Sequence, residues 1–186
     1  LASLPPAALD AELGGRRSFG FAGEDTNERR RFDVGADLLS ARVALARGGR
    51  DSAFEQIKRA AARMPAAPGT TGVAELAGLV ADWPSVTPEE AGRRLERLYT
   101  PAGPGVDSHL ALGAWTRALL LAAAADNRAL LASDWFGSTG SSLAHGPLPQ
   151  ECRASVSEIL AAAAQARTPD DFARCRELAR DLREFL

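Results

Sequence analysis

The chain has 186 residues, enough for one large domain or for two small fused ones. Charged residues make up 25% of it and the formal net charge is -2, a balance that argues against nucleic-acid-binding proteins and against disordered chains. Hydrophobic residues make up 46%, and alanine and leucine are abundant among them. Because alanine, leucine, arginine and glutamate favour helices, we expect an all-α fold of about eight helices.

Residues 1–31 are expected to form an N-terminal arm that lies on the body or tethers it. Pro5-Pro6 and several glycines interrupt any helical period in this segment. The three arginines at 29–31 are interpreted as the solvated start of the first helix, and the alternative is a contact with a phosphate or a lipid head group.

Two consecutive helices are predicted after the arm, from the spacing of apolar residues. The first covers about 27–47, and the second begins near residue 51 and runs to about 64. Gly48-Gly49 separates them, since glycine accepts the left-handed conformation that ends a helix. So short a loop makes the two helices antiparallel neighbours.

A third helix is predicted over about 72–83, and a fourth from Thr87 to about residue 99. Threonine suits the N-cap, and the proline that follows it suits the first helical position. The proline- and glycine-rich residues 101–105 form the clearest linker in the chain.

The second half begins with the most apolar long segment, residues 106–132. Its longest uncharged apolar run, 118–125, is too short to cross a membrane, so we expect no transmembrane segment. A short helix to about residue 136, a long loop over 137–149 and a helix over about 150–166 are predicted next. Thr168-Pro169 then begins the last helix, whose buried positions are predicted to be Phe172, Leu178, Leu182 and Phe185.

Residues 34–50 and 112–128 are similar, which indicates an internal repeat. Gly35 matches Gly113, and Asp126-Asn127 occupies the place of Gly48-Gly49. We therefore predict two helical halves, 32–100 and 106–186, that form one compact domain as a pseudo-twofold helical bundle or array. Because glycine is unfavourable inside a helix, its presence in both copies predicts that another helix approaches the backbone closely there.

The usual motifs of catalysis and metal binding do not occur in the sequence, so we expect no cofactor, no metal and no catalytic residue. His109, in the sequence Asp107-Ser108-His109, is interpreted as part of a capped helix start. Cys152 and Cys175 lie in the last two helices, about 10 Å apart along a helical hairpin, which disfavours a disulfide unless the start of the first of these helices bends back.

Five residues form the best candidate set for ligand binding. A buried arginine needs an anionic or carbonyl partner, aromatic rings can line a pocket, and loops often carry functional histidines. The alternative for each is an ordinary structural role in the core or at the solvated surface. The candidates are Trp115, Arg117, Asp134, Trp135 and His145.

These features favour a non-enzymatic helical binding or scaffold protein that takes a protein or small-molecule ligand. A bacterial-envelope or periplasmic location, after removal of a leader, is one expectation, because the chain starts at Leu1 rather than at Met. A cytoplasmic helical adaptor or regulator with a groove for a partner helix is one alternative. The other is an enzyme whose site assembles only in the folded chain, from His109, His145, Asp134 or Arg117.

Overall fold

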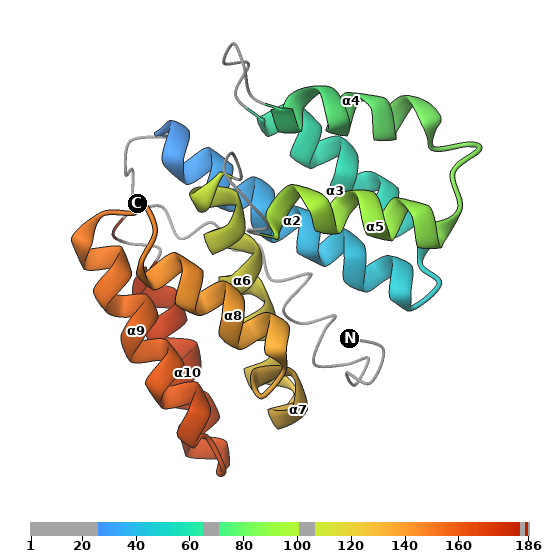
Figure 1. Ribbon diagram of the computed structural model, residues 1–186. Coiled ribbons are helices and arrows are strands. Elements are labelled where there is room, and N and C mark those ends of the chain that lie inside the picture. The colour runs from blue at the N-terminus through green and yellow to red at the C-terminus, as the bar shows by residue number, and fades with distance from the viewer. Residues whose placement is uncertain (1–25, 65–70, 101–106, 183–184, 186) are drawn as a thin grey trace. The chain divides into compact units, whose positions relative to one another are not determined.

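The computed structural model describes residues 26–64, 71–100, 107–182 and 185 (Figure 1). Regular secondary structure in these residues is helical, which confirms the predicted all-α fold. Most of the predicted N-terminal arm and the predicted linker at 101–105 lie outside the described residues. The helices of the described part are, in chain order, α2 (Asn27–Ala46), α3 (Arg50–Arg63), α4 (Thr71–Asp82), α5 (Pro88–Tyr99), α6 (Ser108–Ala124), α7 (Arg128–Leu131), α8 (Asp134–Ala144), α9 (Gln150–Gln165) and α10 (Pro169–Leu182).

The helices gather into two compact units whose boundary falls within α6. One unit is Asn27–Ala114, with α2 to α5 and the first part of α6. The other contains the rest of α6 and the helices α7 to α10. The sequence halves 32–100 and 106–186 stay a prediction, because this division follows contacts rather than sequence similarity.

The first unit is built around α2. This helix packs against α3 and α5, and α4 packs against the same two helices (Figure 1). Val34, Leu38 and Val43 of α2 are fully buried, as are Ile57 of α3 and Leu95 of α5. A helix with apolar residues on more than one face is suited to such a central place.

The turn between α2 and α3 has the predicted glycine-dependent geometry. Gly48 has a φ of +78°, and the backbone N–H of Gly49 donates to the carbonyl of Ala44 at 2.9 Å. The matching turn after α6 has the same pattern. There Asp126 has a φ of +49°, which aspartate tolerates better than most residues, and the N–H of Asn127 donates to Ala122 at 2.8 Å.

The predicted helix caps are confirmed. Thr87 Oγ1 accepts the backbone N–H of Glu90 at 3.2 Å at the start of α5. Before α10 the exchange is reciprocal, because Thr168 Oγ1 accepts from the N–H of Asp171 at 3.3 Å while Asp171 Oδ2 accepts from the N–H of Thr168 at 2.8 Å. The N–H of Arg167 also donates to Asp171, and these backbone hydrogen bonds lower the pKa of its carboxyl group.

In the second unit α9 packs against both α8 and α10 (Figure 1). The predicted long loop over 137–149 is wrong in its first part, because α8 extends through Ala144. Ser133 caps this helix, accepting from the N–H of Phe136 at 3.3 Å, and the side chains of Phe136 and Leu143 are buried. Burial of an apolar face therefore overrides the weak helix propensity of glycine and serine.

Two further predictions for the second unit have different outcomes. Phe172 and Leu182 are buried as predicted. Leu178 and Phe185, also predicted to be buried, are half-buried and 49% exposed, respectively. Cys152 and Cys175 are both buried and free, as their predicted separation requires. None of the described helices is long and apolar enough to cross a membrane.

The two matching glycines lie where α2 and α6 touch backbone to backbone. A methyl group placed on Gly35 would overlap the carbonyl oxygen of Leu110, and one placed on Gly113 would overlap the carbonyl oxygen of Phe32. All four residues belong to the Asn27–Ala114 unit. The predicted close approach of another helix at both glycines is therefore confirmed.

We expect Gly35→Ala and Gly113→Ala each to lower the free energy of unfolding by about 1–3 kcal/mol or more, because the added methyl group meets backbone that can move only with its helix. Urea denaturation followed by circular dichroism measures this change. Gly137→Ala is the matched control, since nothing lies within 4 Å of its added methyl group, and it is expected to gain up to about 1 kcal/mol. Losses under about 0.5 kcal/mol at both Gly35 and Gly113 would contradict the close contact.

Candidate functional site

Trp115, one of the predicted ligand-binding residues, is a core side chain. It is fully buried, and its ring stacks on that of Phe136 with 4.8 Å between centroids and 19° between planes. Its indole N–H donates to the carbonyl of Phe136 at 2.9 Å. The polar group and one ring face of Trp115 are therefore engaged within the protein, which supports the structural alternative for this residue.

The predicted residues of α8 lie at different places along the helix. Asp134 is exposed in the first turn, and Trp135 beside it is half-buried. His145 is exposed at the other end, where its Nδ1 lies 2.8 Å from the carbonyl oxygen of Ser141. The helix rise separates Asp134 and His145 by about 16 Å, so these two do not converge on one small ligand. Arg117 is half-buried in α6.

We expect Trp115→Phe to lower the free energy of unfolding by about 2 kcal/mol, because it leaves a void and removes a buried hydrogen bond. Thermal and urea denaturation measure the loss. His145→Gln, at an exposed position of the same unit, is the control and is expected to stay within about 0.5 kcal/mol of the parent protein. A Trp115→Phe protein of unchanged stability would instead favour the predicted pocket.

Arg50, which the sequence did not single out, ties α3 to the turn before α5. Its guanidinium donates to the carbonyl of Val86 at 2.9 Å and to that of Trp83. It also lies over the ring of Trp83, 5.0 Å from the centroid, and the same ring stacks on Phe54 at 5.1 Å. The arrangement fixes the turn by charge-assisted hydrogen bonds and ring contacts.

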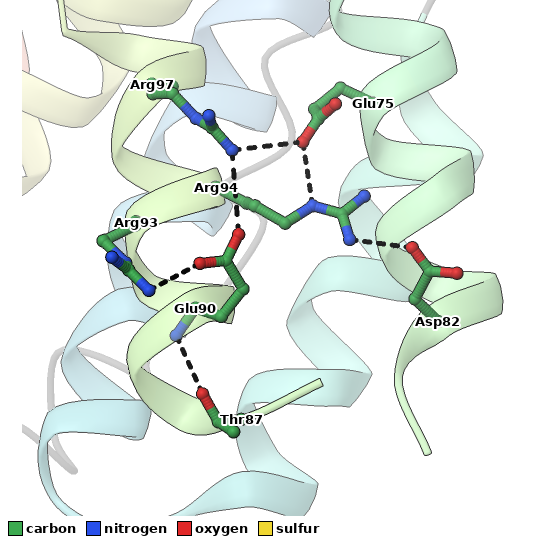
Figure 2. A network of polar contacts seen from close by, with 7 residues as sticks. All are labelled: Glu75, Asp82, Thr87, Glu90, Arg93, Arg94 and Arg97. Atoms are coloured by element: carbon green, nitrogen blue, oxygen red, sulfur yellow. Dashed lines mark hydrogen bonds and ion pairs between the residues drawn. The ribbon is translucent and has the colours of Figure 1, made fainter. Parts of the chain in front are cut away.

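A network of acidic and basic side chains joins α4 and α5 (Figure 2). Arg94 lies at its centre, donating to Glu75 at 2.9 Å and to Asp82 at 2.8 Å with only 14% of its side chain exposed. These two hydrogen bonds, the one to Asp82 first, raise the pKa of Arg94. Arg93 pairs with Glu90 at 2.7 Å at the edge of the network.

We expect Arg94→Met to lower the free energy of unfolding by about 1 kcal/mol, because two carboxylates of α4 lose their shared cation. The loss is expected to shrink in 1 M salt, which screens charges. Arg93→Met is the matched control, since that side chain is 73% exposed and makes a single pair within one helix. Equal effects of the two substitutions in urea denaturation would show that Arg94 does not join the helices.

Another cluster of titratable groups surrounds the start of α6. Asp107 Oδ1 caps the helix by accepting from the N–H groups of His109 at 2.9 Å and Leu110 at 3.3 Å. Asp107 Oδ2 pairs with Arg31 of α2 at 3.0 Å. His109 Nδ1 lies 3.8 Å from Asp107 Oδ1, too far for a hydrogen bond, and its buried Nε2 has no hydrogen-bond partner in the described part of the chain.

Burial lowers the pKa of His109, although the carboxylates of Asp107 and Glu28 oppose this effect. The imidazole is therefore neutral at neutral pH. A general base has to reach its substrate, whereas the Nε2 atom of His109 is enclosed. Among the described residues, no three histidine, cysteine, aspartate or glutamate side chains lie close enough together to hold a metal ion.

The geometry of the described part thus provides capped helices and arginine contacts between helices, and the five predicted ligand-binding residues do not converge as a group. Comparison with known proteins adds no assignment. No protein-family model matches the chain, and searches of curated proteins and of solved structures gave no significant match.

Proposed function

We propose that this chain is a non-enzymatic helical binding or scaffold protein. The proposal rests on the contacts that its half-buried arginines make. In the first unit each of four arginines connects its own helix to another element, rather than pointing with the others into a common site. The connections are Arg31 to Asp107, Arg50 to Val86 and Trp83, Arg63 to Asp37, and Arg94 to Glu75 and Asp82.

The pair of Arg63 and Asp37 is an example of an arginine contact that connects two helices. Asp37 is only 7% exposed in α2, and Arg63 of α3 donates to it at 3.0 Å. Arg59 of the same helix lies 3.9 Å from the other carboxylate oxygen. Removing Arg63 would take a close cation from the buried carboxylate of Asp37, which is unfavourable, so the pair helps to fix how α3 lies on α2. Side chains used in this way preserve a shape, which is what a binding surface requires.

We further propose that the two halves derive from one helical unit and pack about a pseudo-twofold axis. Two local similarities support this proposal. The turns after α2 and α6 share three backbone hydrogen bonds at matching positions. In addition, Gly35 meets the residue three positions before Gly113, and Gly113 meets the residue three positions before Gly35, as a local twofold axis requires. The matched losses expected for the two glycine variants test this symmetry.

Native mass spectrometry of the protein purified gently from its own source tests the binding function. We expect a molecule to co-purify at fixed stoichiometry and to bind the recombinant protein again in calorimetry. His109 and His145 are the only histidines, so a variant with glutamine at both positions has no imidazole. We expect this variant to bind equally well, and the bound molecule to keep its mass during incubation.

Chemical conversion of the bound molecule by the parent protein, and its loss in the double variant, would contradict the proposal and favour an enzyme. Absence of any bound molecule, together with a bare monomer from the native source, would contradict both the binding and the scaffold function.

A further inference from the structure

His109 lies beside the backbone contact between α2 and α6. The next residue along α6, Leu110, provides the carbonyl that faces Gly35. Across the contact, Arg31 precedes Phe32, whose carbonyl faces Gly113. The ion pair between Arg31 and Asp107 therefore joins the same two helix segments that the glycines bring together.

The surroundings of His109 suit a neutral ring better than a charged one. Its side chain is 16% exposed, and its Nε2 atom is buried with no hydrogen-bond partner among the described residues. With the proton of the neutral ring on Nδ1, the nitrogen nearer Asp107, protonation places a second N–H at Nε2. No described residue accepts a hydrogen bond there, so protonation has a cost in free energy. Of the charged groups around it, Arg31 of α2 repels an imidazolium, whereas Asp107 and Glu28 attract it.

Asp107 is a poor partner for a protonated His109, because its two oxygens already serve the helix N-terminus and Arg31. We propose that His109 makes the contact between α2 and α6 sensitive to acid. The contact is firm while the imidazole is neutral, and it loosens when the imidazole is protonated. The proposal concerns the stability of the fold and does not depend on the binding function.

The direction of the pH dependence follows from linkage between protonation and folding. Burial lowers the pKa of His109 in the folded protein below the value of about 6.5 that it has in the unfolded chain. The unfolded state therefore binds the proton more readily. The stabilisation is complete above that unfolded value and is lost as the pH falls toward and through the folded pKa.

The first test is an NMR titration of the histidine ring protons in the parent protein. His145→Gln leaves one histidine and so assigns the signal of His109. We expect the midpoint of His109 in the folded protein to lie below the midpoint of the same residue in urea. A folded midpoint equal to or above the unfolded one would overturn the proposal without any substitution at His109.

Hydrogen exchange then tests the contact itself. Between pH 7 and pH 5, after correction for the intrinsic effect of pH, we expect exchange in 27–46 and 108–114 to accelerate about fivefold in the parent and in His145→Gln. In His109→Gln the change is expected to stay below about twofold. An equal acceleration in His109→Gln and the parent would show that acid acts through other groups. Should His109→Gln fail to fold, the NMR midpoint still decides.

Discussion

The first unit depends on the contact of two helix backbones, α2 and α6, at Gly35 and Gly113. A glycine inside a helix costs about 1 kcal/mol relative to alanine, so its place in both helices needs a compensating gain. The gain is close approach, which lets neighbouring apolar side chains fill the space between the helices. Val34, Leu38 and Leu112, all near the contact in sequence, are fully buried. Two small residues thereby determine how tightly the first unit is packed.

The polar contacts of this unit add to that apolar packing by selecting one arrangement of the helices. Arginine side chains are long, and their apolar stems lie along the protein while the guanidinium reaches a carboxylate or a carbonyl on another helix. Arg94 reaches two acidic residues of α4, and Arg50 reaches the backbone of the turn before α5. Apolar packing alone permits helices to slide or rotate, whereas such directed hydrogen bonds select one arrangement.

Sequence reasoning succeeded where the structural cause is local. The glycine turn at Gly48 and the caps at Thr87 and Thr168 depend on the backbone within a few residues, and all three are present. It failed over 137–144, where local propensity indicates a loop but burial of Leu143 and its neighbours stabilises a helix.

The same distinction between local and distant causes applies to the residues of the candidate site. From its sequence neighbours alone, Trp115 can be read as a pocket residue. Its ring stacks on Phe136 and its N–H donates to the carbonyl of Phe136, which lies 21 residues further along the chain. The partners of Arg50 and Arg94 are equally distant in sequence. The glycines at matching positions of the two similar segments did predict the close approach of another helix, because only a residue without a side chain lets two backbones touch.

The buried cysteines of α9 and α10 have a chemical consequence for the second unit. Burial raises the pKa of both thiols, so little thiolate forms at neutral pH, and no oxidant or alkylating agent can reach the sulfur atoms directly. Cys152 and Cys175 are therefore inert while α9 and α10 stay packed together. Chemical modification of either thiol therefore requires local opening of this helix pair, and its rate reports how often the pair opens.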